Sequence, residues 1–312
     1  MNSKIIIGVD NGNENTKTAN FVFTTGIEKF DKKPPLGNDV MKFNGRYFAL
    51  VNSRSTYEQD KTVNEDTFIL TLFAIAKELK HRIDRNIITK EKYYDIALSV
   101  GLPPGHFALI NEKFRSYFMQ NGQNITMEYN GETFHINISN VFVFPQGFAA
   151  IISQPGLLTE YEKSYLIDIG GYTTDVILLV KGIPDLSVCY SINAGMILMN
   201  QAISNAVQAK FGLDIEASHI SSVLQGKKHV LNSDVVSEII NQAEKYIVDL
   251  LKKLRERGID LRIYPAIFVG GGSLLAKNLI ENSKDKSIVK FVEDIQANAK
   301  GYEYAAKLKL NN

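Results

Sequence analysis

Three short turns rich in glycine carry the residue types that bind phosphate. They span Asp10–Lys17, Asp168–Thr174 and Gly270–Ser273, and each follows an apolar run. Glycine lets backbone amides approach phosphate oxygens, hydroxyl and amide side chains complete the cradle, and the carboxylates of Asp10 and Asp168 can hold a hydrated magnesium ion. Taken alone, a run of glycines after a strand is more often a tight strand–helix turn. Taken together, the three turns predict a site for a nucleoside triphosphate.

The turns do not follow either of the common phosphate-loop sequences. The chain contains no Gly-x-x-x-x-Gly-Lys-Ser/Thr and no Gly-x-Gly-x-x-Gly, so neither a P-loop nor a dinucleotide fold is indicated. The first two turns instead join strands. Lys4–Val9 is expected to return as Thr18–Phe23, and the run before Asp168 is expected to return as Val176–Val180. Two such hairpins suggest two halves of the molecule that face one ligand.

The composition is that of a globular protein with sizeable cores. The 312 residues are 45% hydrophobic and 22% charged, with a formal net charge of +1. That charge provides no field for nucleic acid, so any link to DNA is expected to run through a partner. The one cysteine, Cys189, is expected to be a core thiol in a reducing cytoplasm. No apolar run has transmembrane length, and the strand expected directly after Met1 leaves no room for a signal peptide, so we expect no membrane association.

Turn and periodicity signals place these loops on an alternating series of strands and helices. Asn44-Gly45 and Asn130-Gly131 each predict a tight hairpin, and the 3.6-residue apolar period predicts a helix over Thr62–Arg85. Capping residues at Asn232 and Ser233 predict a long helix over Asp234–Gly258. The other expected elements are strands at Tyr94–Leu102, Val141–Phe144, Asp185–Ile192 and Ala266–Val269, and helices at Phe107–Asn121, Met196–Phe211, Ala217–Leu224, Leu274–Glu281 and Asn298–Leu308, with a short helix opened by Pro145-Gln146-Gly147.

Five motifs in order resemble those of the actin/Hsp70/sugar-kinase superfamily. Val9–Lys17 resembles its first phosphate loop, Asp168–Asp175 its second and Phe268–Ser273 its nucleoside loop, while Pro145–Ala150 and Gly301–Ala306 resemble its two connecting helices. The resemblance spans nearly the whole chain. It implies an α/β, actin-like two-domain fold with nucleotide in the interdomain cleft. Domain I would hold residues 1–160 with the C-terminal helix 296–312, and domain II would hold 161–295.

The resemblance also implies a role for each matching residue. Asp10 and Asp168 would organise Mg²⁺ through water, and Asp168 would act in catalysis together with Gln146, which would orient the attacking water. The residues expected around ATP (or GTP) are Asp10, Asn11, Gly12, Asn13, Asn15, Thr16, Lys17, Gly170, Gly171 and Thr173 at the phosphates, and Gly270, Gly271, Gly272 and Ser273 under the nucleoside. Since glutamine is not a strong base, hydrolysis would depend on positioning and electrostatic stabilisation. Gln146 could instead simply cap the connecting helix.

Within the superfamily, the chain resembles the ParM/StbA group of plasmid-segregation actins. This resemblance rests on Leu98–Pro103, Glu112–Arg115, Phe43–Tyr47 and the Asn-Gly hairpin that runs into Val143–Pro145. It implies an ATPase that polymerises with itself into filaments and moves plasmid DNA through a DNA-binding adaptor of ParR type. A carboxylate is expected in ParM at the position of Gln146, whereas glutamine there resembles actin. The alternatives are a sugar or acyl kinase of the same superfamily and an actin-like cytoskeletal scaffold without a role in segregation.

Overall fold

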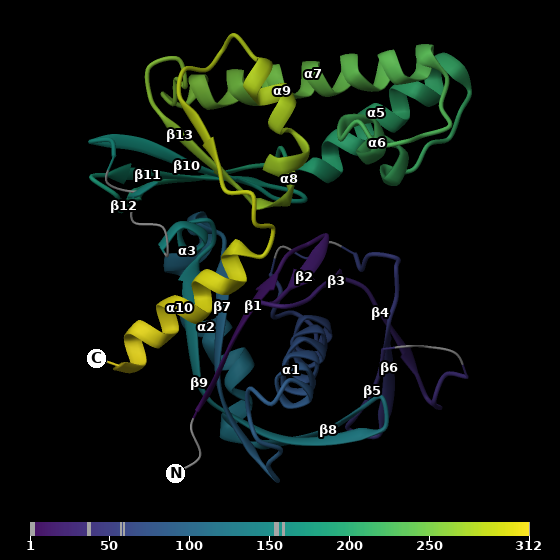
Figure 1. Ribbon diagram of the computed structural model, residues 1–312, viewed down its shortest axis with the longest axis vertical. Helices are drawn as coiled ribbons and strands as arrows, with labels where there is room; N and C mark the ends of the chain where they lie inside the picture. The colour runs from purple at the N-terminus through teal and green to yellow at the C-terminus, as the bar shows by residue number, and fades with distance from the viewer. Residues whose placement is uncertain are drawn as a thin grey trace. The chain divides into compact units, whose positions relative to one another are not determined.

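The computed structural model consists of two compact α/β units (Figure 1). It describes residues 4–35, 39–56, 58, 60–152, 156–157 and 160–311. Unit 1 combines Met1–Ser153 with Gln296–Asn312, and unit 2 is Gln154–Ile295. The start of the chain at Met1, on which the expectation about a signal peptide depends, lies outside the described residues.

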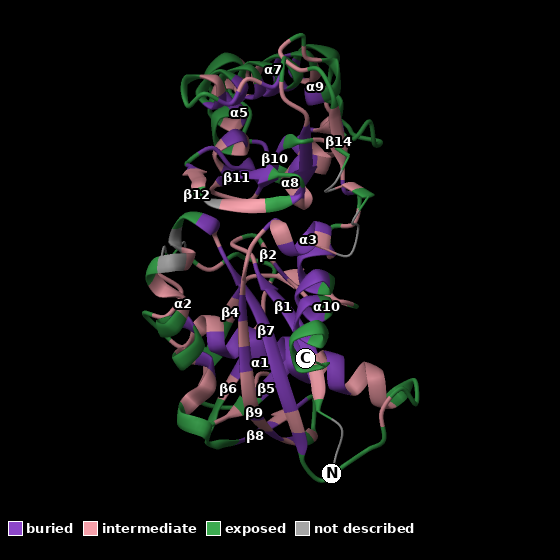
Figure 2. Cartoon of the chain, turned by 90° about the vertical axis from the view of Figure 1, so that its left-hand side faces the viewer, coloured by how far each residue is buried: buried purple, intermediate pink, exposed green. Residues whose placement is uncertain are grey.

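Unit 1 is built on a mixed sheet in the order β3-β2-β1-β7-β9-β8-β5-β6-β4. The β1–β7 and β7–β9 pairs are parallel, and the other neighbouring strands of this sheet are antiparallel. Strands β1 and β7 are buried along most of their length (Figure 2). The strand bounds are β1 Ile5–Asn11, β2 Asn15–Lys17, β3 Val22–Thr24, β4 Ile27–Phe30, β5 Val40–Phe43, β6 Arg46–Leu50, β7 Tyr94–Leu102, β8 Asn124–Tyr129 and β9 Glu132–Pro145.

Both predicted Asn-Gly hairpins are confirmed. β5 pairs with β6 and β8 with β9, and Asn44 and Asn130 have positive φ angles of 48° and 51°, as a two-residue hairpin turn requires. The strand predicted at Val141–Phe144 is part of the longer β9, which continues from the hairpin through the middle of the sheet. Polar residues such as Asn137 and Asn140 interrupt its apolar pattern, so the sequence indicated its first part, as an arm of the Asn-Gly hairpin, and its last part, but not that the two form one strand.

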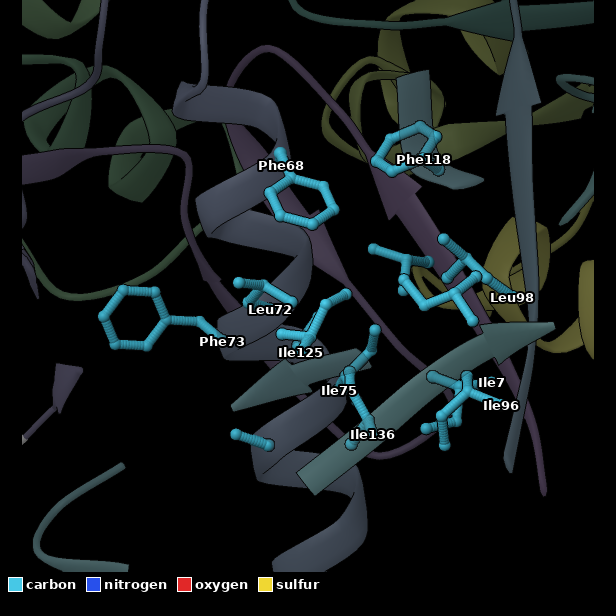
Figure 3. Close-up of a cluster of buried hydrophobic side chains, with 14 of the residues drawn as sticks. Ile7, Phe68, Leu72, Phe73, Ile75, Ile96, Leu98, Phe118, Ile125 and Ile136 are labelled. Atoms are coloured by element: carbon cyan, nitrogen blue, oxygen red, sulfur yellow. The ribbon is translucent and has the colours of Figure 1, made fainter. Parts of the chain in front are cut away.

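The helices of unit 1 are α1 Asp66–Asp84, α2 Pro104–Met119, the 3₁₀ turn η1 Gln120–Gly122, α3 Phe148–Ile152 and α10 Ala297–Asn311. Helix α1 begins four residues later than predicted because the Asn64 side chain accepts a hydrogen bond from the Asp66 amide (2.9 Å) and ends the preceding turn. Its apolar face enters the core, where Leu72 and Ile75 belong to the same buried cluster as Ile96 and Ile136 of the sheet (Figure 3). Burial of this face against the sheet is what stabilises α1 in place.

Unit 2 has a five-stranded sheet in the order β12-β11-β10-β13-β14. The strands are β10 Lys163–Ile169, β11 Thr174–Val180, β12 Ile183–Ile192, β13 Ala266–Val269 and β14 Val289–Phe291, and the helices are α5 Met196–Phe211, α6 Ala217–Leu224, α7 Ser233–Glu256, α8 Gly270–Leu275 and α9 Lys277–Asn282. The predicted cap of α7 is confirmed, because Asn232 Oδ1 accepts from the Val235 amide at 2.9 Å. Strand β14 was not predicted, since it is three residues long and only half-buried.

Candidate functional site

The first predicted phosphate loop closes the hairpin between β1 and β2. Asp10 pairs with Lys17 and Asn11 with Thr16 across the hairpin. The return strand therefore begins at Asn15, three residues before the predicted start at Thr18. The Lys17 ammonium lies 3.5 Å from Asp10 Oδ2, and both side chains are largely buried, with 15% and 5% of their surface exposed.

Gln146 lies beside the same carboxylate. Its side-chain nitrogen donates to Asp10 Oδ1 at 3.4 Å, so the Asp10 carboxylate lies between an ammonium group and an amide group. The main chain fixes Gln146 from both sides: its amide donates to the Leu102 carbonyl (2.8 Å), and the following Gly147 amide donates to Asn298 Oδ1 (2.9 Å). Three residues that the sequence assigned to one site thus come together in unit 1 from the end of β1, from β2 and from the end of β9.

Residues that the sequence did not indicate shape this loop. The Thr25 hydroxyl donates to the Gly12 carbonyl (2.7 Å), and it lies 3.0 Å from the hydroxyl of Thr16, which is fully buried. Lys61 donates to the carbonyl oxygen of Asn11. Because these contacts depend on the tertiary fold, no spacing in the sequence reports them. The Thr16 hydroxyl, which the sequence placed at the phosphates, is therefore engaged with Thr25.

A hollow opens beside the loop within unit 1. Its polar walls come from the loop itself, from the segment before α1 and from the first turn of α1. The lining residues are Asn11, Gly12, Asn13, Thr25, Ser55, Thr56, Glu58, Lys61, Asn64, Asp66, Thr67 and Leu70.

The second predicted loop closes the β10–β11 hairpin in unit 2. Asp168 pairs with Asp175, and the Gly170 amide donates to the Thr173 carbonyl (2.8 Å), so four residues make the turn. The turn is held by the start of α5, whose first amides donate to three successive carbonyls. These bonds are Met196 to Gly170 (3.0 Å), Ile197 to Gly171 (2.8 Å) and Gly195 to Tyr172 (2.9 Å).

This pattern determines where the amides of the loop point. In a trans peptide the C=O and N–H groups point in opposite directions. Since the carbonyls of residues 170, 171 and 172 face α5, the amides of residues 171, 172 and 173 face the other way. Three neighbouring amides that face away from α5 are a suitable arrangement for binding phosphate oxygens.

Gly195 permits this close packing, although no motif in the sequence indicated that it belongs to the site. A Cβ atom at this position would lie 2.2 Å from the Gly171 carbonyl oxygen. Tyr246 of α7 also stabilises Gly195, since its hydroxyl donates to the Gly195 carbonyl at 3.0 Å. Burial raises the pKa of Tyr246 to about 12, so this donor stays protonated at neutral pH.

The third predicted loop lies against the aspartate of the second. Asp168 is 8% exposed, and Gly270 has a φ angle of +87° with its hydrogen directed at Asp168 Oδ1, where a Cβ atom would come within 2.2 Å. Helix α8 starts at Gly270 itself, earlier than the predicted helix start at Leu274. Ser273 is fully buried and donates to the Val269 carbonyl at 2.5 Å, so its hydroxyl stabilises the turn. Thr173 donates to Asp175 Oδ2 at 3.4 Å.

The carboxylates of Asp10 and Asp168 are compatible with magnesium only if the ion also keeps other oxygen ligands. Among the described residues, no three His, Cys, Asp or Glu side chains gather into a possible metal site. Mg²⁺ commonly binds through one or two carboxylates while water and substrate phosphates complete its shell. Asp10 of unit 1 and Asp168 of unit 2 each lie at the end of a buried strand, and each is a suitable carboxylate for such a shell.

Other titratable groups do not suggest a second reaction. Burial raises the pKa of the Cys189 thiol to about 11, which keeps it protonated and unreactive.

Of the helices that the structure describes, none is both long enough and apolar enough to cross a membrane.

Two units, each with a mixed sheet and with phosphate-loop hairpins at matching places, define the actin-like two-domain fold. The family comparisons agree with this class. Residues 8–148 match the N-terminal domain of actin-like proteins, and residues 166–282 match the C-terminal domain of the archaeal actin homologue MreB-like family. Both stretches of the chain thus match domain models of actin homologues.

Solved structures resemble the chain over nearly its whole length. The archaeal actin homologue Ta0583 has a TM-score of 0.76 at 21% identity, with 97% of this chain and 99% of that chain covered. ParM of pSK41 has a TM-score of 0.70 at 16% identity, with 98% of each chain covered. Bacillus thuringiensis ParM with ATP has a TM-score of 0.68 at 16% identity, with 99% of this chain and 100% of that chain covered. A comparison with curated protein sequences finds no match.

Proposed function

We propose that this chain is an actin-like nucleoside triphosphatase that assembles into filaments with copies of itself. The observation that supports this most strongly is the grouping of Asp10, Lys17 and Gln146 at the loop of the β1–β2 hairpin. A cation, a carboxylate and an amide are the groups needed to hold phosphate, hydrated magnesium and an attacking water.

Each residue has a distinct task in this proposal. Lys17 and the amides of Gly171, Tyr172 and Thr173 contact phosphate oxygens, while Asp10 and Asp168 orient the water ligands of Mg²⁺. Gln146 donates its NH₂ group to Asp10, which leaves its side-chain oxygen to accept from the attacking water. The loop with Gly270 supports the nucleoside. The ion itself would neutralise charge on the phosphates as the bond breaks.

What related structures contain supports the ligand and the assembly. Ta0583 has been solved in complex with ADP, Bacillus thuringiensis ParM with ATP, and AlfA as a filament bound to AMPPNP. Their identities to this chain are 22%, 16% and 16%, so we carry these properties over as part of the proposal.

For the cellular role we propose DNA segregation through a ParR-type adaptor, as the resemblance to ParM implies. A cytoskeletal scaffold is a second candidate, favoured by the match of residues 166–282 to an archaeal MreB-like domain. The two roles differ in one testable respect. Filaments of a segregation motor should co-sediment with a DNA-binding protein encoded beside this gene, and a scaffold should have no such partner.

The decisive experiment measures assembly directly. We expect light scattering to rise when Mg-ATP or Mg-GTP is added to the purified protein, and negative-stain microscopy to show filaments. EDTA should prevent both. A protein that stays monomeric or dimeric with either nucleotide and phosphorylates a sugar or an acyl group would contradict the proposal and indicate a kinase of the same fold.

A further inference from the structure

Both arms of the β1–β2 hairpin contact one buried cluster of charged residues, which we call the Arg82 cluster. It consists of Glu78 and Arg82 on α1 and Glu303 on α10. Arg82 lies between the two acids, with Nη2 2.7 Å from Glu303 Oε1 and Nε 3.0 Å from Glu78 Oε2. Only 0%, 14% and 12% of the side-chain surfaces of Glu78, Arg82 and Glu303 are exposed. None of these residues belongs to the predicted phosphate site.

The cluster completes the hydrogen bonding of β1 where no strand does so. Residues Ile5–Val9 pair with β7 on one side, but on the other side β2 reaches only Asp10 and Asn11. Arg82 Nη1 donates to the Ile6 carbonyl (2.8 Å), and Glu303 Oε1 accepts from the Gly8 amide (3.1 Å). Alternate residues of a strand direct their polar groups to the same edge, so the ion pair occupies the place of a neighbouring strand.

Strand β1 packs against α10 so tightly at Gly8 that there is no room for a side chain. A Cβ atom on Gly8 would lie 2.1 Å from the Ala299 carbonyl oxygen of α10 and 2.9 Å from Glu303 Cγ. Strand β1 is therefore in direct contact with α10 two residues before Asp10.

The same cluster holds the other arm of the hairpin. Glu78 accepts from the Thr18 hydroxyl (2.6 Å), from the Asn20 amide (3.0 Å) and from Asn20 Nδ2 (2.9 Å). Thr18 directly follows Lys17, the cation of the candidate site. The cluster thus contacts the chain just before the phosphate loop and just after it.

We propose that Glu78, Arg82 and Glu303 are positioning residues for the first phosphate loop, which they hold in its binding geometry without touching the ligand. The consequence for nucleotide binding rests on the function proposed above, whereas the effect on the hairpin does not. A guanidinium group is suited to this task because its planar fork donates to the Ile6 carbonyl, Glu303 and Glu78 at once, and an ammonium group has no such fixed geometry.

The first test requires no nucleotide. Amide hydrogen exchange is compared by mass spectrometry for the wild type, Arg82→Lys, Glu303→Gln and Arg82→Met. We expect exchange in residues 10–20 to rise by about tenfold or more in Arg82→Met and by less in the two conservative variants, while exchange in β7, β9 and unit 2 stays unchanged. The matched control is Lys80→Met on the same helix, which removes ion pairs to Asp84 and Glu132 at the surface.

Two exchange results would overturn the proposal. One is that residues 10–20 of Arg82→Lys and Arg82→Met exchange their amide hydrogens as slowly as those of Lys80→Met. The other is a uniform rise over all of unit 1 in every cluster variant, which indicates general destabilisation instead of a local role. Arg82→Lys and Glu303→Gln keep hydrogen-bonding groups in place, so they remain informative if Arg82→Met fails to fold.

The second test measures the affinity for Mg-ATP of the same proteins by calorimetry. We expect the dissociation constant of Arg82→Lys to rise about tenfold with the stoichiometry unchanged, and Lys80→Met to bind as the wild type does. Unchanged affinity together with a loosened hairpin would show that the cluster does not position the loop for nucleotide. If the wild type binds neither ATP nor GTP, the proposed function fails, and hydrogen exchange alone decides the role of the cluster.

Discussion

The Asp10 carboxylate has two partners with different roles. Lys17 offsets its charge, and the Gln146 amide is oriented by it. Because Gln146 directs its NH₂ group at Asp10, the remaining oxygen of the amide can accept a hydrogen bond from water but is too weak a base to remove its proton. Hydrolysis at this site would therefore depend on orientation, as the glutamine in place of a carboxylate implied.

Changing Gln146 to alanine should separate assembly from turnover. We expect Gln146→Ala to form filaments with Mg-ATP and to release phosphate about tenfold or more slowly, because the attacking water loses its orientation. A phosphate-release assay run alongside light scattering measures both. Gln123→Ala, at an exposed position, is the control. Unchanged phosphate release would remove Gln146 from the mechanism.

Asp168 should be required for both assembly and hydrolysis. In Asp168→Ala the second loop loses the carboxylate near the end of β10 that lies against Gly270. We expect triphosphate-dependent scattering and phosphate release to disappear while the far-UV circular dichroism spectrum is retained. Asp249→Ala, on the exposed face of α7, should behave as the wild type. Normal hydrolysis in Asp168→Ala would show that the site is assigned to the wrong residues.

Glu303 should make the stability of unit 1 depend on pH. Burial raises the pKa of this carboxyl above its ordinary value, and Arg82 offsets part of the shift; the other charged neighbour is Glu78. Between the unfolded and the folded pKa the native state binds the proton more tightly. Stability is therefore highest below the unfolded pKa and falls as pH rises through the folded pKa, by at most about 1.4 kcal/mol per pH unit.

The isosteric variant Glu303→Gln should lack this dependence. Urea unfolding of both proteins from about pH 4 upward measures it. We expect the difference in unfolding free energy, variant minus wild type, to increase with pH across that window and then to level off. Parallel profiles for the two proteins would contradict the assignment of the shift to Glu303.

At the scale of elements, regular periodicity and turn chemistry were reliable guides. α5, α6 and β13 have the predicted bounds, and both Asn-Gly hairpins are present, because each depends on a pattern within its own segment. The short strands β4 and β14 lie at sheet edges and are not fully buried. Pairing with a neighbouring strand holds them in place more than burial of apolar side chains does, so their sequences show little of the pattern that predicts a strand.

The same distinction applies to the candidate site. Asp10, Lys17 and Gln146 could be assigned to one place because their motifs resemble known loops. The contacts of Thr25, Lys61 and Gly195 with the loops, and that of Arg82 with β1, could not be predicted, because each joins segments that are distant in sequence. The residues proposed to carry the chemistry could therefore be selected from the sequence, while the residues proposed to position them required the fold.

The contact between α5 and the second loop gives a prediction with a control on the same helix. Gly195→Ala places a Cβ atom against the Gly171 carbonyl, so the loop must shift and we expect nucleotide affinity to fall about tenfold or more. Gly212→Ala, at the other end of α5, has open space and a φ angle of +67°. It should cost about 1 kcal/mol of stability without changing affinity. Calorimetric titration and urea unfolding separate the two effects, and equal affinities would contradict the close packing.

At the scale of the whole molecule, the order of the chain matters. Unit 2 is one continuous segment, whereas unit 1 needs α10, which returns after unit 2 and contacts β1, β7 and α3. Tyr302, Ala299 and Ala306 of α10 are buried in unit 1. The covering of β1 and the Glu303 contact to Gly8 both come from this returning helix.

Removing α10 should therefore damage one unit only. We expect truncation before Gln296 to expose α1 and β1 to hydrogen exchange and proteolysis while α5 and α7 stay protected, because the core of unit 2 contains no residue of α10. Truncation before Lys307 serves as the control, because the described residues that it removes, 307–311, are all exposed. Equal loss of protection in both units would show that they do not unfold separately.

The late return of α10 also has a consequence for synthesis. A ribosome adds residues in chain order, at about 5–20 per second, and domains tend to fold as they emerge. The segment of unit 2 can be completed during translation, but the open edge of β1 has to wait until α10 has left the ribosome. During that interval the nascent chain presents an unpaired strand edge, and we expect it to be the stage at which chaperones bind this protein.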